Sequence, residues 1–149
     1  MYPILLALHN LVRWVVLILA ILAVVRAYLG WFGKRAWTGR DRQVGMFTGM
    51  AIDIQFLLGL LLHIFFSPLT RSAFQNFGAA MGNPDLRFFA LEHVFYMVLA
   101  VVFAHLGSIL PRKVEGAAAK HQRAAIWFSL MLVVVLLGTP WTRPLLRGF

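Results

Sequence analysis

Histidine is the residue type in this chain with the most chemical potential, because a neutral imidazole binds metals and also titrates near neutral pH. The chain has five histidines, and most of them fall inside or at the rims of long apolar stretches. A polar, metal-ligating side chain is costly in hydrocarbon, so a histidine inside a membrane span predicts a functional site. On the topology derived below, three lie near one membrane face and two near the other. The three near one face are His9, His63 and His93, and the two near the other are His105 and His121. This arrangement indicates a bound heme.

Depth along the helices selects the candidate iron ligands. At a rise of about 1.5 Å per residue, His9 and His93 each lie about six residues, or roughly 9 Å, inside the outer end of their spans. His63 lies about four residues from the outer end of its own span. Two axial imidazoles must come from facing helices at similar depth, so His9 and His93 are the predicted ligands of a heme iron. His63 is the reserve ligand, or a partner for a propionate or a quinone.

An arginine shares the helix face of His9. Arg13 follows His9 by four residues and therefore lies one turn further along the same face. An arginine at this depth needs a partner, because an unpaired charge in hydrocarbon is expensive. A heme propionate is one candidate partner, and Asp53 and Gln55 in the second span are others.

Two further residues are candidates for contact with the cofactor. Tyr96 follows His93 within one helical turn. Gly59 lies one turn before His63, where the missing side chain makes room either for a porphyrin or for a neighbouring helix. Gly45 and Gly49 form a small-xxx-small pattern, which favours close helix packing.

The two inner histidines predict a second site less strongly. His105 lies about five residues inside the inner end of the third span, and His121 lies at the mouth of the fourth, at headgroup level. His93 and His105 are twelve residues apart, which is about 120° around an ideal helix, so they do not share one face. A second heme at His105 and His121 would need the fourth helix to begin earlier, at about Gly116. One heme is the main prediction and two the alternative.

Composition identifies the bilayer as the solvent for much of the chain. Hydrophobic residues make up 61% of the 149 residues and charged residues 13%, whereas soluble domains carry about 25% charged residues. The net charge of +9 is concentrated in two short loops, which favours membrane topology over binding to nucleic acid. The absence of cysteine excludes thiol catalysis, thiolate metal sites and covalent heme attachment. Zinc held by His9, His63 and His93 is a minor alternative.

The hydropathy pattern predicts an all-α integral membrane four-helix bundle. Four stretches reach the length of about 20 apolar residues that a span requires, at about 3–29, 45–67, 87–110 and 123–141. The first lacks the basic start and the cleavage site of a signal peptide, so we expect it to be retained. Short loops between spans favour a single domain, residues 1–149, with up-down-up-down topology.

Basic residues predict the orientation. Nine of them lie in or beside the loops 30–44 and 111–122, against four on the opposite side. The positive-inside rule makes these loops cytoplasmic and places both termini outside, in a bacterial inner membrane. The outer connection, 67–87, is rich in helix breakers and could carry a short helix over 73–81, either as a lid or docking surface or as a simple connector.

The segments LHNLVRW (8–14) and LEHVFYM (91–97) place histidines inside apolar helices, and in this the chain resembles the small four-helix membrane b-type cytochromes. The resemblance implies noncovalent heme b and electron transfer, with quinone as a candidate partner, alone or within a larger respiratory or redox complex. If the protein is an enzyme, it is a membrane oxidoreductase. The twelve-residue histidine spacing departs from the longer same-helix spacing of diheme cytochromes b. The alternative is a non-redox bundle, a transporter-like or assembly subunit, in which Arg13, Asp53 and the histidines form a proton or ion relay.

Overall fold

The computed structural model describes residues 1–141, and all regular elements in this part of the chain are helical. The longest are α1 (Tyr2–Phe32), α2 (Gly39–Leu61), α6 (His93–Ile109) and α7 (Ala117–Gly138). The all-helical prediction is confirmed for these residues.

Four helical segments are long and apolar enough to cross a membrane, as the hydropathy predicted. They are Tyr2–Phe32, Gly39–Phe66, Pro84–Lys113 and Ala117–Gly138. The predicted bounds need correction, most of all for the fourth segment, which begins at Ala117 and not at about residue 123. Gly116 precedes it with a φ of 79°, a conformation that glycine adopts without steric cost. Residues 117–122 fall in the predicted loop because Lys120, His121 and Gln122 are polar, and hydropathy does not register helical backbone outside an apolar run.

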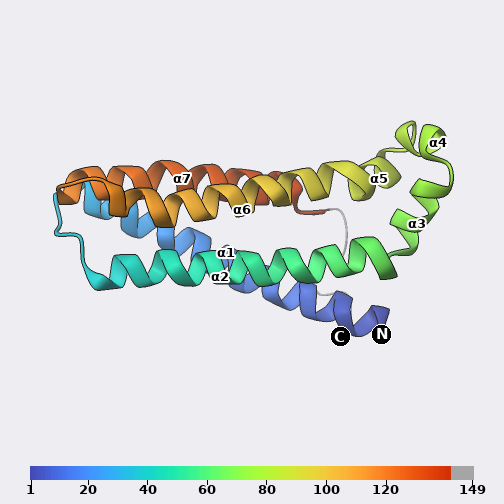
Figure 1. Ribbon diagram of the computed structural model, residues 1–149, viewed down its shortest axis with the longest axis horizontal. Helices are drawn as coiled ribbons and strands as arrows, with labels where there is room; N and C mark the ends of the chain where they lie inside the picture. Colours follow the sequence, from blue (N-terminus) through green and yellow to red (C-terminus); the bar gives the residue numbers. More distant parts are fainter. Residues whose placement is uncertain (142–149) are drawn as a thin grey trace.

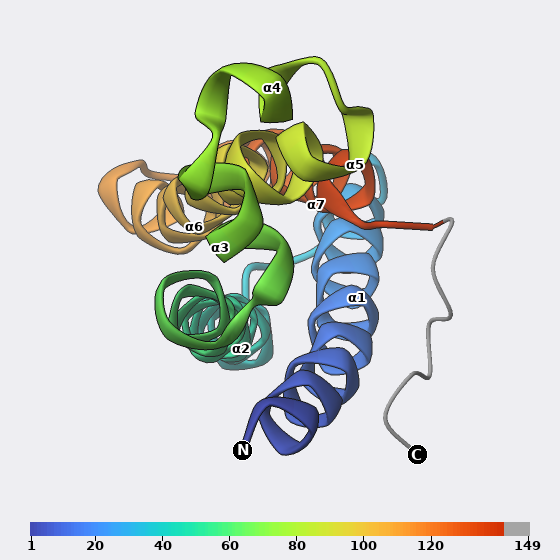
Figure 2. The same cartoon turned by 90° about the vertical axis from the view of Figure 1, so that its right-hand side faces the viewer.

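The four long helices pack in a ring. α1 packs against α2 and α7, and α6 packs against the same two helices. α1 and α6 therefore lie on one diagonal of the bundle, and Figure 2, which looks along the long axis, shows this arrangement. Side chains that point inward from α1 and α6 face one another across the bundle.

The two ends of the bundle differ in their connections (Figure 1). At one end lie the loop that joins α1 to α2 and the turn η3 (Leu110–Lys113) that leads to α7. The other end carries three short helices, α3 (Pro68–Gln75), α4 (Phe77–Met81) and α5 (Pro84–Arg87). We call these the loop end and the cap end.

The short helix predicted at the outer connection is present, but it is divided into α3 and α4. Ser67 begins α3, and its side-chain oxygen accepts a hydrogen bond from the Thr70 backbone nitrogen. Asn76 begins α4 in the same way, accepting from the Ala79 backbone nitrogen. Asn76 has φ −143° and ψ 78°, so the helix breaks there and starts again.

Two π-helical turns lie near the cap end. η1 (Leu62–Phe66) extends α2, and η2 (Phe88–Glu92) runs directly into α6. Each such turn holds one residue more than an α-helical turn, so it rotates the side chains that follow, and π turns occur frequently at functional sites. His63 lies within η1, and His93 is the residue that follows η2.

The loop end is packed through small residues. The Ser108 hydroxyl of α6 donates a hydrogen bond of 2.8 Å to the Gly45 carbonyl of α2. A Cβ added at Gly45 would lie 3.3 Å from the Phe128 ring, and one at Gly49 would lie 3.8 Å from Ser108 Oγ. The small-xxx-small pattern therefore serves packing between helices within the chain, as predicted.

Candidate functional site

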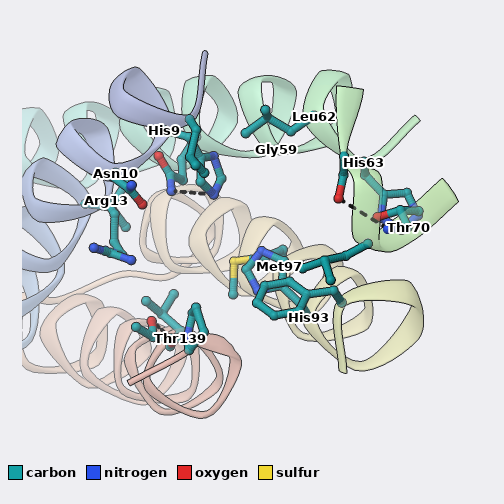
Figure 3. A pocket seen from close by; sticks show the side chains of 18 of the residues that line it. His9, Asn10, Arg13, Gly59, Leu62, His63, Thr70, His93, Met97 and Thr139 are labelled. Atoms are coloured by element: carbon teal, nitrogen blue, oxygen red, sulfur yellow. Dashed lines mark hydrogen bonds between the residues drawn. The ribbon is translucent and has the colours of Figure 1, made fainter. Parts of the chain in front are cut away.

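The structure brings His9, His63 and His93 together around one cavity. It has a volume of about 370 Å³ and lies between the four long helices and α3, near the cap end. This volume falls within the usual range for small-molecule and cofactor sites, about 300–1,000 Å³. Five of the six residues predicted to contact a cofactor line it, and Figure 3 shows them around the cavity. They are His9, Arg13, Gly59, His63 and His93.

The two predicted axial ligands face one another. The ring centroids of His9 and His93 lie 6.2 Å apart, and the ring planes make an angle of 72°. The two side chains come from α1 and α6, the helices on the bundle diagonal. Because a metal lies about 2.0–2.1 Å from a ligating imidazole nitrogen, two rings on opposite sides of one ion have centroids roughly 6 Å apart. The spacing of the rings in the structure matches this requirement.

The protein holds His93 by one ring nitrogen. Its Nδ1 lies 2.7 Å from the carbonyl oxygen of Gly138, so Nδ1–H donates and Nε2 keeps its lone pair. Gly138 is the last residue of α7, where carbonyls have no partner within their own helix. A histidine whose second nitrogen donates to a backbone carbonyl is oriented as metal-ligating histidines are.

His9 shows a related pattern. Its Nε2 lies 3.2 Å from the side-chain amide nitrogen of Gln55 on α2, and Gln55 Oε1 is buried without a partner among residues 1–141. With this amide turned over, Oε1 accepts from Nε2–H, and Nδ1 keeps its lone pair. The Nδ1 of His9 is buried and has no hydrogen-bond partner among residues 1–141. Buried polar atoms in proteins are almost always bonded, so a buried ring nitrogen without a partner indicates a place for a ligand. Both rings of the pair are thus fixed by the protein at one nitrogen only, and in this respect they fit a bound heme iron.

Arg13 lies beside this pair. Its side chain is only 8% exposed, lines the cavity and lies 5.9 Å from the centre of the Trp14 ring. Of the protein partners considered for Arg13, Gln55 lines the same cavity, but Asp53 does not. The Asp53 carboxylate instead contacts His105, so the interpretation of Asp53 as a partner of Arg13 is not supported. α2 directs residues 53 and 55 about 200° apart around its axis, which separates the two side chains.

His63 lines the cavity from the cap end. Its Nδ1 lies 3.5 Å from the Thr70 hydroxyl, and its ring makes an edge contact with Phe74 of α3, with centroids 6.0 Å apart. Within residues 1–141 no group of three or more His, Cys, Asp or Glu side chains is placed to hold a metal ion. The zinc alternative therefore has no support, whereas a heme iron needs only two protein ligands because the porphyrin supplies the other four.

Tyr96 does not line the cavity, unlike the other predicted contacts. A Cβ added at Gly138 would lie 2.8 Å from Tyr96 Cβ, so Tyr96 packs against the end of α7. Met97 lines the cavity in its place. The reason is helical geometry, because a residue four positions after His93 lies closer to its face than a residue three positions after it.

The other two histidines, His121 and His105, have different partners. His121 is 1% exposed, its ring lies 4.8 Å from that of Trp37, and it fills the space above Gly30 between α7 and α1. His121 is therefore buried between helices at the loop end, and its position at headgroup level stays a prediction. His105 is exposed, with Nε2 3.0 Å from an Asp53 oxygen. Although α7 begins as early as a second heme would require, the cavity beside His121 measures only about 10 Å³, and His105 does not line it.

Sequence reasoning missed two features of the site. The Gly138 carbonyl that orients His93 comes from a residue 45 positions away, and a backbone acceptor leaves no trace in side-chain patterns. The π turns η1 and η2 also have no compositional signal. The breaker Pro140 two residues after Gly138 does mark the end of α7, and it could have located the free carbonyls there.

Comparisons with protein-family models, with curated proteins and with solved structures found no match to this chain. Its function must therefore be inferred from the cavity and from the residues that surround it.

Proposed function

We propose that this protein is an integral membrane electron-transfer protein that binds one heme b, with His9 and His93 as the axial ligands. The observation that carries the proposal is the pairing of these rings across the bundle diagonal, with centroids 6.2 Å apart. The Gly138 carbonyl and the Gln55 amide hold one nitrogen of each ring. Two neutral imidazoles at this spacing suit a low-spin iron.

Four long apolar helices support insertion in the bilayer. Large aliphatic side chains are exposed on their outer surfaces, such as Ile18 at 64%, Leu57 at 60% and Val133 at 51%. In water such a surface would aggregate, whereas lipid solvates it. We propose up-down-up-down spans, with the basic loops 30–44 and 111–122 on the cytoplasmic side of a bacterial inner membrane.

The remaining cavity residues have roles that follow from their chemistry. Heme supplies a one-electron couple, whose potential depends on axial ligands, burial and hydrogen bonding. The Arg13 guanidinium is suited to bind a propionate carboxylate, since such charge-assisted pairs are strong in buried surroundings. The Gly138 carbonyl makes His93 a more basic ligand by accepting a hydrogen bond from its Nδ1–H. The electron partner we propose is a quinone in the bilayer or a neighbouring subunit of a redox complex.

The decisive experiment is an absorption spectrum of protein purified from heme-replete cells. We expect a low-spin b-type spectrum that is lost in His9→Ala and in His93→Ala. The matched controls are His105→Ala, on the exposed surface, and His121→Ala, buried at the loop end; both should keep the spectrum per folded molecule. A stable but colourless native protein would overturn the proposal. A spectrum that survives both ligand substitutions would overturn the ligand assignment and direct attention to His63.

The orientation has its own test. A reporter fused after Phe149 should be active when the reporter requires the outer compartment and inactive when it requires the cytoplasm. Activity restricted to the cytoplasm would invert the proposed topology. It would leave the pairing of His9 with His93 unaffected, because that pairing depends on the fold and not on its direction in the membrane.

A further inference from the structure

Asp53 and His105 form a polar pair on the outside of the bundle. His105 Nε2 of α6 lies 3.0 Å from an Asp53 oxygen of α2, and the two side chains are 46% and 41% exposed. Asp53 lies about 12 Å along the helix from residue 45, where the predicted second span begins, and His105 lies about 8 Å inside the end of the predicted third span. The pair therefore lies within the hydrocarbon of a membrane that these helices span, nearer to the loop end than to the cap end.

Lipid is a poor environment for this pair. Ionisable side chains inside membranes almost always face a bundle interior or a partner, because hydrocarbon offers them no hydrogen bonds. One contact leaves part of the bonding capacity of the carboxylate unused, as well as the second ring nitrogen of His105. Exposed side chains elsewhere at this depth are aliphatic throughout, both on α1 over residues 11–25 and on α7 over residues 126–137. The face formed by α2 and α6 is thus chemically distinct from the other lipid-facing surfaces.

We propose that this face is the interface of a homodimer in the membrane. A twofold axis beside the pair brings the Asp53 of each copy to the His105 of the other, because a twofold interface presents the same patch from both sides. The pair is self-complementary, with one acidic and one basic member. Apolar side chains within one turn of it complete the contact, namely Met50 and Leu57 on α2 and Val102 on α6, each 45% exposed or more.

The dimer rests on the proposed membrane insertion, but not on heme binding. The cavity residues His9 and His93 lie inside the bundle, whereas Asp53 and His105 do not line that cavity. Loss of the dimer should therefore leave the heme spectrum unchanged, and loss of heme ligation should leave the dimer intact.

The chain contains no cysteine, so single cysteines can report the interface without background. In lipid vesicles at low protein density, Leu57→Cys should crosslink to a covalent dimer under oxidising conditions. Ile18→Cys is the matched control, because it is equally exposed on α1, and it should remain monomeric. Crosslinking at both positions alike, or at Ile18→Cys alone, would overturn the proposed face.

The second measurement is energy transfer between differently labelled copies during dilution in lipid. Asp53→Leu should shift the dissociation midpoint at least tenfold towards monomer, and His105→Leu should do the same. Three results would overturn the dimer alone. They are native protein that is monomeric in the bilayer, a dissociation midpoint that is unchanged in both variants, and a stable complex with a different protein on this face. Release of the native chain from membranes by carbonate would overturn the membrane proposal and the dimer together.

Discussion

Histidines at the two ends of the bundle occupy opposite kinds of environment. At the loop end the His121 ring is buried above Gly30, beside a cavity of only about 10 Å³. Near the cap end His9 and His93 face one another at a cavity of about 370 Å³. The same side chain thus fills space at one end and borders open space at the other. Each ring lies against a glycine, Gly30 for His121 and Gly59 for His9, so the space on the other sides of the ring distinguishes these roles.

Small side chains account for the tight packing of the loop end. Ala23 and Ala27 of α1 and Ala124 and Ala125 of α7 are at most 4% exposed, and close approach of helix backbones is the usual consequence of such residues. Near the cap end α1 diverges from α7 in Figure 2, and the π turns η1 and η2 alter the direction of the neighbouring side chains. The cavity lies where the small-residue packing ends.

The largest effect should come from adding volume at the loop end. In Gly30→Ala the new Cβ would collide with the His121 ring, which has no space to move into, so we expect a loss of about 1–3 kcal/mol of stability. Thermal denaturation in detergent measures it. Gly39→Ala is the matched control, because a Cβ there meets nothing within 4 Å.

A double variant makes this prediction specific. His121→Ala should restore much of the lost stability in the Gly30→Ala background, since it removes the ring with which the methyl group collides. Equal stability of Gly30→Ala and Gly39→Ala would show that the loop end is not tightly packed, and the comparison between the two ends would fail.

The sequence predicted the helices and the identity of the cavity residues better than it predicted the contacts among them. Four apolar helices and the facing pair His9 and His93 follow from hydropathy and depth, which are properties of the chain itself. The burial of His121 does not, because it depends on Gly30 and Trp37, which lie more than 80 positions away in sequence. The prediction of Asp53 as a partner of Arg13 lacks support for the same reason. The direction in which the Asp53 side chain points depends on how α2 is rotated against α6.

The next effect, on heme binding and not on stability, should follow from changing the charge at the cavity. Arg13→Leu removes a guanidinium suited to a propionate, and hydrogen bonds to charged groups contribute about 1.5–3 kcal/mol. On the proposed heme binding, we therefore expect heme affinity to fall by roughly tenfold or more, with the fold retained. Arg13→Lys, which keeps the charge but not the planar donor group, should lose less. Heme titration of apoprotein measures both, and unchanged affinity and yield in Arg13→Leu would contradict the pairing.

The smallest effect on stability should come from Gly59→Ala, which makes the same glycine-to-alanine change near the cap end. Its Cβ would lie 2.9 Å from Cε1 of His9, which is closer than ordinary van der Waals contact. Here, however, the neighbour is the end of a side chain beside a cavity, so the ring can turn away from the methyl group. Alanine also favours the helix over glycine by about 1 kcal/mol, which offsets the cost of that movement. We expect stability within about 0.5 kcal/mol of native. On the proposed ligation by His9, we also expect a shifted heme absorption band, because the His9 ring would have changed its orientation. A loss of stability as large as that of Gly30→Ala would mean that the cap end resists added volume as strongly as the loop end does. It would also mean that the His9 ring has no freedom to adjust to a ligand.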